Sequence, residues 1–449
     1  MRLLAWSCVV LFLCSGLPPA AAQGFRESLG SAVSGAHTVQ VGAQGQGLAP
    51  DDFQRLALER NADLLAVRQD IAAARGFVTQ ARLRPNPGVD VSVTSGRPLG
   101  SPGERAFDVG YAHTIELGGK RARRIDVAQV GVEIAEFLVA DRERLLRADI
   151  HARYAEALAA ARNFATLGEL YELNDRSLRV ATQRVSEGEG APLERILLQV
   201  EVGRMAADRS LAGGAAERAF TALKLASGMP PSDSLVLRGE LTTPGVDVSL
   251  DQAVERALMQ RPDLKAARAE EARADAELRL AGAERVPDVI GVVRYEQNST
   301  RFEQFGTTAS GQIVPLRDTD RTLTAGVSIP LPFANRNQGA IEAAQARRQA
   351  AALRRQYIEQ SVRADVRAAF AQYVGARQAI DAFDGQVIKQ VQQTVNIIRT
   401  SYELGESQLL DLVQEQRRLV ETQKAFTDVL KELYIARATL EAAVGGELR

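Results

Sequence analysis

The sequence predicts a mainly α-helical protein that also carries four β-strands of membrane-spanning length, built as two copies of one unit. Three observations support this fold class. Identical residues recur in register between positions 57–87 and 257–287, two very long segments keep the helical period, and four short segments alternate apolar with polar residues. A repeat of this kind indicates a tandem of long antiparallel helical hairpins, each with its own pair of strands.

The first 22 residues predict a secretory signal peptide that is cut near Gln23. Arg2 precedes the apolar run from Leu3 to Leu13, and the segment ends in the small residues Ala20 to Ala22. This order is typical of a cleaved export signal. Residues 23–50 are rich in Gly, Ala, Gln and Ser and show no period, so we expect a flexible mature N-terminus.

The composition favours neither catalysis nor nucleic acid binding. With 55 basic and 56 acidic residues, the formal net charge is -1, which gives no reason to expect nucleic acid as a partner. Cys8 and Cys14 both lie in the predicted signal peptide, so the mature chain is left without thiols. His113 and His151 have no partners at metal-ligand spacing and are expected to be packing residues. We therefore predict no enzyme activity, no cofactor and no metal site.

The first unit is predicted over residues 51–245 and the second over residues 246–449. Each unit begins with a helix, passes through two strands into a long helix, and ends with another helix. In the first unit the strands are expected at about 88–96 and 106–115 and the long helix at 118–186. In the second unit the strands are expected at about 288–297 and 321–331 and the long helix at 338–404.

The four predicted strands have roughly the 8 to 11 residues that cross a bilayer at a tilt, with one apolar and one polar face. A half-buried soluble sheet would alternate in the same way. The strand pairs are joined by polar loops at 96–105 and 298–321, whereas their other ends run into helices, so all helices must lie on one side of the sheet. Four strands are too few to close a barrel, and open edges are not tolerated in lipid. If the strands span a membrane, several chains must close one barrel together.

The long helices are each expected to extend about 100 Å. The remaining helices, at 51–84, 191–227, 251–284 and 406–444, are about half as long. Two of them stacked end to end would match one long helix, so each unit is predicted to supply one long and one composite helix to an elongated bundle.

Two corners connect strands to long helices. Gly118 and Gly119 are predicted to permit the first tight turn, and Lys120 with the arginines that follow it is expected near anionic headgroups. The second corner is predicted at Pro330, Pro332, Asn335 and Asn337, where either asparagine could cap the long helix.

The chain resembles the TolC family of outer-membrane efflux channels, and within it the CzcC-type subunits of heavy-metal resistance pumps. The residues that carry the resemblance are the two-copy layout and four short motifs: ELGGKR at 116–121, EGEGAPLE at 187–194, IPLPFANRNQGAI at 329–341 and ELGESQLLD at 403–411. The resemblance implies a homotrimer with a twelve-stranded β-barrel in outer-membrane lipid, continuing into a periplasmic α-helical barrel. It also implies a periplasmic adaptor (membrane fusion protein) and an inner-membrane pump of the resistance-nodulation-division class as partners.

The resemblance further implies roles for residues at the helix turns farthest from the strands. The adaptor would contact the tips at Gly188, Gly190, Gly405, Leu409 and Leu410. An acid follows each leading glycine by six positions, at Glu194 and Asp411, and the family places an aspartate at the second position that narrows the closed end of the tunnel. A further family acid is replaced by Gln414, with Glu415 next to it. An ordinary solvated acid on a helix surface would explain Asp411 equally well.

These features together predict a passive, gated conduit that exports divalent cations such as Co, Zn, Cd or Ni. A channel for organic drugs or for secreted polypeptides remains the main alternative. A periplasmic adaptor is less favoured, because adaptors usually carry one helical hairpin and this chain predicts two.

Overall fold

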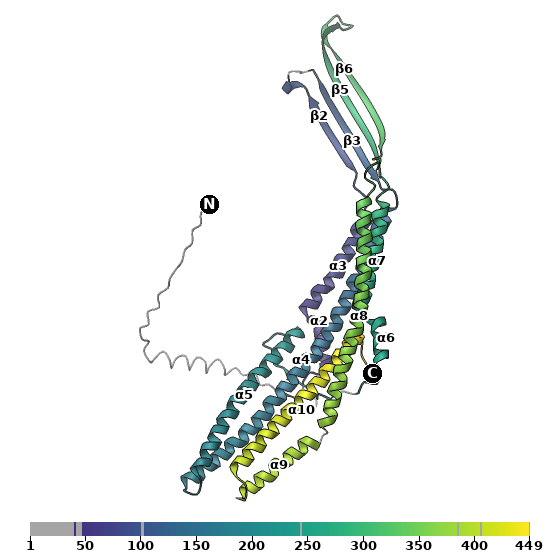
Figure 1. Ribbon diagram of the computed structural model, residues 1–449. Coiled ribbons are helices and arrows are strands. Elements are labelled where there is room, and N and C mark those ends of the chain that lie inside the picture. The colour runs from purple at the N-terminus through teal and green to yellow at the C-terminus, as the bar shows by residue number, and fades with distance from the viewer. Residues whose placement is uncertain are drawn as a thin grey trace, which may run out of the picture.

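The computed structural model describes residues 40–41, 47–99, 103–242, 245–383, 386–404 and 406–448. The predicted signal peptide, most of the predicted flexible N-terminus and Gly405 lie outside these ranges. Figure 1 shows an elongated molecule with the strands at one end, helical hairpins at the other, and the C-terminus near the middle. All long helices therefore extend from the same side of the sheet.

The sheet has four antiparallel strands in the order β2-β3-β5-β6. The first pair, β2 (Gly88–Ser95) and β3 (Arg105–Ile115), lies where the alternation predicts it. The second pair is much longer, with β5 at Val289–Thr307 and β6 at Ile313–Ser328. The prediction of a polar loop over 298–321 is wrong, because most of that segment continues the hairpin. It has no apolar face to reveal a strand, yet ladder hydrogen bonds need no apolar side chains.

A long helical segment leaves each corner. α4 (Lys120–Ser186) is a single helix. Within the helix predicted over 338–404, the described residues form α8 (Gln338–Phe383) and α9 (Gln386–Glu403). Residues 384–385, between these two helices, lie outside the described residues.

The predicted helices at 51–84 and 251–284 are also divided. The first comprises α2 (Pro50–Arg60) and α3 (Ala62–Arg82), and the second comprises α6 (Leu250–Gln260) and α7 (Pro262–Ala283). The break at Asn61 is stabilised because its side chain accepts a hydrogen bond from Leu64 N at 3.0 Å, which caps α3. Pro262 starts α7, where its missing N–H costs nothing.

Each break meets the end of a helix from farther along the chain. α5 (Pro192–Ala226) is followed two residues later by Gly228, which has φ +71°. A Cβ on Gly228 would lie 2.7 Å from the Arg60 carbonyl group. Asn61 Nδ2 donates to Ala226 O at 2.8 Å. α10 (Leu409–Val444) ends at Gly445, with φ +90°, against the break at Arg261. Because α3 and α5 both pack along α4, they form a composite helix beside it, as the lengths predict.

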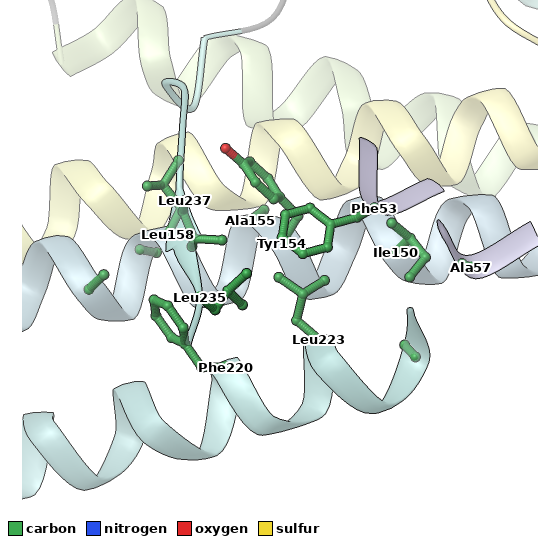
Figure 2. Packing of buried hydrophobic residues seen from close by; sticks show 14 of the residues in the cluster. Phe53, Ala57, Ile150, Tyr154, Ala155, Leu158, Phe220, Leu223, Leu235 and Leu237 are labelled. Carbon is green, nitrogen blue, oxygen red and sulfur yellow. The ribbon is translucent and has the colours of Figure 1, made fainter. Parts of the chain in front are cut away.

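The main core lies at the waist of the molecule, where α2, α4 and α5 meet the segment that follows α5. This segment includes β4 (Val236–Leu237), which pairs in parallel with β1 (Gln40–Val41). Figure 2 shows Leu235 and Leu237 packed with Tyr154, Leu158 and Leu223. The hydroxyl of Tyr154 donates to Arg238 O at 2.7 Å. The linking segment is thus held as part of the core.

The junction at Gly228 gives a stability prediction. We expect Gly228→Ala to lower the free energy of unfolding by about 1–3 kcal/mol, because the added Cβ meets the Arg60 backbone and the residue has a left-handed conformation. Thermal unfolding of the purified protein, followed by circular dichroism, measures the loss.

Gly203→Ala is the matched control, since Gly203 lies inside α5 with nothing within 4 Å of the added Cβ. There we expect no loss and a gain of up to about 1 kcal/mol. Equal melting temperatures for the two variants would contradict the role assigned to the junction.

Candidate functional site

The two faces of the sheet differ in chemistry. Residues that are paired across strands share a face, and one face carries apolar side chains at Val89, Val91, Val93, Phe107, Val109, Tyr111, Ile115, Val293, Tyr295, Leu323 and Val327. The other carries polar side chains at Asp90, Ser92, Thr94, Asp108, Arg294, Glu296, Thr322 and Thr324. Several of the apolar side chains are openly exposed, including Val93 at 75% and Leu323 at 74%. No protein layer covers this face in the described part of the single chain.

The edges of the sheet are also incomplete in one chain. Among the strands described, β2 pairs only with β3 and β6 only with β5. Their outer backbone N–H and C=O groups therefore have no strand partner, and such groups are costly in lipid. One chain therefore leaves an apolar face uncovered and two strand edges open.

The first corner docks on the end of α7. Gly118 has φ +70°, and a Cβ there would lie 2.9 Å from the Val286 side chain, so only glycine fits. Gly119 follows, also with a positive φ, directly before α4. Asp288 accepts hydrogen bonds from Leu117 N at 3.1 Å and from Lys120 Nζ at 2.7 Å.

These contacts change the role expected for Lys120. Its side chain is only 12% exposed and forms an ion pair with Asp288, and Arg124 forms an ion pair with Glu116. The expectation that they meet anionic headgroups is not supported, because both cations are neutralised inside the chain.

The second corner also contacts the end of α7. Asn337 has φ +60°, and its Nδ2 donates to Ala281 O at 3.0 Å and to Glu284 Oε2 at 3.1 Å. Asn335 Oδ1 accepts from Asn337 N at 3.0 Å. Pro330 and Pro332 lie in the short stretch without helix or strand between β6 and α8. The end of α7 therefore supports both strand-to-helix corners, which sequence spacing alone does not reveal.

Glu194 and Asp411 occupy equivalent places at the far tips, each as the third residue of its helix, α5 or α10. Asp411 Oδ2 accepts from Gln408 N at 3.2 Å, which helps to cap α10, and its side chain is exposed. Glu194 is half-buried and is hydrogen-bonded to Tyr402. Burial, and then the nearby Glu194 carboxylate, raise the pKa of Tyr402. In the described residues no hydrogen bond or ion pair joins Asp411 to Glu194.

The other predicted tip residues divide into packing and surface groups. Leu409 is only 5% exposed and packs with Ala181, Leu198 and Val413, so it fastens the two hairpins together. Leu409 is therefore too buried to form the predicted adaptor contact. Leu410, which is 51% exposed, is accessible for such a contact.

The remaining predicted tip residues are the glycines and the neighbours Gln414 and Glu415. Gly188 follows α4 with φ +81°, and Gly190 packs against the Val185 backbone. Gly405 lies outside the described residues. Gln414 is exposed, whereas Glu415 is half-buried and lies 3.8 Å from Arg418 Nη1.

A buried carboxylate that the sequence analysis missed joins the hairpins. The Glu201 side chain on α5 is 3% exposed and is bound by Arg204 of the same helix and by Arg417 of α10. Burial opposes ionisation, but hydrogen bonds from these arginines outweigh it and hold the pKa of Glu201 below its usual value. An acid and an arginine three positions apart, as in Glu201 and Arg204, are common on helix surfaces. Only the contact with Arg417, on the other hairpin, distinguishes Glu201 from such surface acids.

The waist holds a cavity of about 840 Å³ between α2, α4 and α10. His151 of α4 lines it, with Nδ1 3.3 Å from the Tyr434 hydroxyl oxygen and Nε2 3.2 Å from Gln54 Oε1. The imidazole therefore bridges helices of both halves. This histidine is a packing residue, as predicted, but with two polar partners that the sequence does not show.

No metal site or membrane helix is evident in the described ranges. There, no group of three or more His, Cys, Asp or Glu residues is placed to hold a metal ion. Nor does any helix in those ranges combine the length and the apolar content that crossing a membrane demands.

Comparison with known proteins gives consistent matches along the chain. The sequence pattern of the family described as outer membrane efflux protein matches residues 54–229 and 253–446. The cobalt-zinc-cadmium resistance protein CzcC of Cupriavidus metallidurans is 25% identical over 399 residues, covering 87% of this chain and 88% of that protein. The nickel-cobalt-cadmium resistance protein NccC of Alcaligenes xylosoxydans xylosoxydans is 29% identical over 269 residues, covering 56% and 57%.

Solved structures share the fold. The CmeC outer membrane channel of Campylobacter jejuni superposes with a TM-score of 0.71 at 16% sequence identity, covering 89% of this chain and 86% of that one. Its fold, with strands at one end of long helical hairpins, is thus the fold of this chain.

His151 gives a pH-dependence prediction. Burial lowers the pKa of His151 from its ordinary 6.5, opposed by Glu441, Asp51 and Glu447 and assisted by Arg437. The folded protein therefore binds fewer protons here than the unfolded chain. The stabilisation is complete above pH 6.5 and is lost as the pH falls from there to the depressed folded pKa.

We expect His151→Gln to show a smaller drop in melting temperature between pH 7.5 and pH 5 than the wild type. His113→Gln, which removes a histidine of β3 away from the cavity, is the control. A pH response in His151→Gln equal to that of the wild type would contradict the prediction.

Proposed function

Because the chain belongs to the outer membrane efflux protein family, we propose that three copies form one channel that exports divalent heavy-metal cations across the outer membrane. The observation that carries this proposal is the two-faced, open-edged sheet at one end of helices that all extend the same way. Such a chain can complete its sheet only with other copies of itself.

The closing geometry follows from the edges. In a closed barrel the outer edge of β6 would pair with β2 of the next copy, which satisfies the backbone groups that one chain leaves open. Three copies would supply twelve strands, above the minimum of about eight for a membrane barrel. The apolar face would meet lipid and the polar face would line the lumen. The helices would continue the tube into the periplasm.

The cargo is inferred from the relatives and from the charge of the polar face. Both relatives described above are named for resistance to divalent metals, among them cobalt and cadmium. On the polar face, Asp90, Asp108 and Glu296 outnumber Arg294 at the level where all four strands pair. An excess of carboxylates along a pore favours cations over anions.

The partners are inferred from the shape. A conduit with no energy source needs a pump, so we propose an inner-membrane pump of the resistance-nodulation-division class and a periplasmic adaptor. The tips offer exposed apolar side chains for such a contact, including Leu193 at 64% and Leu410 at 51%. Gly188 and Gly190 lie in the same turn between α4 and α5.

Deletion of the gene tests the cargo. We expect the deletion strain to accumulate several-fold more cell-associated zinc, cobalt, cadmium or nickel under metal challenge, as measured by elemental mass spectrometry, with reversal on complementation. An antibiotic panel is run in parallel. Unchanged metal content together with new antibiotic sensitivity would overturn metal export and favour the drug-channel alternative.

Asp411 tests the gate. Threefold symmetry would bring three Asp411 carboxylates together near the axis, where their repulsion and their cation binding both influence opening. In planar bilayers we expect Asp411→Asn to weaken block by periplasmic divalent cations about tenfold, or about 1.4 kcal/mol. Asparagine keeps an oxygen for the Gln408 N–H, so the helix start is preserved.

Glu415→Gln is the matched control, because that carboxylate pairs with Arg418 on the same helix. We expect its block to match the wild type. If both variants, or neither, lose the block, Asp411 is an ordinary surface acid.

A further inference from the structure

We propose that four arginines on the apolar side of the sheet, Arg105, Arg301, Arg317 and Arg321, bind the phosphate groups of lipid in the outer leaflet of the membrane. This inference rests on the proposed barrel, in which that side faces lipid. We call these residues the arginine cluster.

The strand register puts all four side chains on one face. Arg321 pairs with Gln297, Arg105 pairs with Ser299, and Arg301 pairs with Arg317, in three successive rows. Two contacts verify the alignment of these rows: the Tyr295 hydroxyl donates to Gln297 Oε1 at 3.2 Å, and the Ser299 and Thr319 hydroxyl oxygens are 3.3 Å apart. The register irregularity of β5 begins only after Arg301.

The arginine cluster lies directly beyond the apolar band. On β5 and β6 the band ends at Tyr295 and Leu323, two residues from Gln297 and Arg321 respectively, in the direction away from the helices. On β3 it reaches Phe107, in the row of Gln297 and Arg321. Rows on one face of a sheet are about 7 Å apart, so three rows span about 14 Å. The guanidinium groups therefore lie at the height of the lipid headgroups of the leaflet distant from the helices.

The charges of this region are sorted by face. From Arg317 to Arg321 the sequence reads Arg-Asp-Thr-Asp-Arg, which places Asp318 and Asp320 on the face opposite the arginines. On β3 and β5 the carboxylates of Asp108 and Glu296 also lie on the opposite face. Of the acids in the described residues nearby, Glu303 alone falls within the irregular stretch of β5 after Arg301.

The four guanidinium groups have no anionic partner among the described residues. All four side chains are exposed, and none takes part in an ion pair or a side-chain hydrogen bond. About half of the arginines at the corners and along the helices are ion-paired, as Arg124 is with Glu116 and Arg417 with Glu201. Four unpaired cations gathered on one lipid-facing surface need anions from outside the chain.

Phosphate is the anion that fits best. Guanidinium groups bind phosphate through paired N–H donors, and the hydroxyls of Ser299 and Thr319 lie in the middle row as additional donors. A lipid source is favoured over free phosphate because the apolar band directly below would hold the acyl chains of the same molecule. The ligand class is therefore a phosphorylated lipid with its headgroup at the outer surface.

The test uses the full-length protein in detergent and native mass spectrometry. The probes are bis-phosphorylated lipid A, the same lipid with both phosphates removed, and inorganic phosphate alone. The test variant combines Arg105→Gln, Arg301→Gln, Arg317→Gln and Arg321→Gln. The matched control is Arg294→Gln, which removes an exposed arginine of β5 from the opposite face.

We expect the wild type and the control to retain bis-phosphorylated lipid A, and the quadruple variant to bind it at least about tenfold more weakly. The wild type, the Arg294→Gln control and the quadruple variant should all bind dephosphorylated lipid A weakly. The proposal is overturned if the quadruple variant binds like the wild type, if Arg294→Gln loses as much, or if inorganic phosphate alone displaces the lipid.

The outcome is separable from that of the proposed function. Assembly of each variant is checked by the mass of the intact complex, and metal accumulation is measured in cells complemented with the same variants. Loss of lipid binding with intact assembly supports the arginine cluster whether or not the metal assay identifies the cargo. Failure of the wild-type chain to assemble would instead remove the barrel on which both proposals depend.

Discussion

The constraint on which the structure depends is that backbone N–H and C=O groups cannot remain unpaired in lipid. One chain supplies four strands and leaves the outer edges of β2 and β6 open. In the proposed channel, further copies of the chain would pair with these edges. Because the strands continue directly into the helices, the helices would extend the same tube beyond the membrane.

The corners transmit that arrangement from sheet to helices. Gly118 and Asn337 both adopt positive φ angles and both press on the end of α7. One helix end thus sets the direction of α4 and of α8. At the opposite end, Leu409 and the Glu201–Arg417 contact fasten the hairpins of the two halves. These contacts therefore hold the helices together at both ends of the bundle. The bundle is too thin for one large core to hold it along its whole length.

The sequence predicts the elements whose signal is periodic and misses those held by single contacts. α4 and the first strand pair are predicted well because their apolar period is strong. The breaks at Asn61 and Arg261 are missed because one cap or one proline outweighs a continuous helical pattern. The far part of the long β5–β6 hairpin is missed because its apolar residues, such as Phe305 and Leu316, do not alternate regularly with polar ones. The Glu201–Arg417 contact joins residues far apart in the chain, so no local pattern could identify it.

The unequal continuity of the helices has a mechanical consequence. α4 runs from the corner to the tip as one continuous helix, whereas each composite helix is assembled from two helices that meet end to end. The composite helices have joints at Gly228 and Gly445. A rod resists bending along its whole length, whereas a jointed strut bends where its hydrogen-bond ladder is interrupted. Each chain therefore combines one stiff strut with jointed ones, and each half carries one joint.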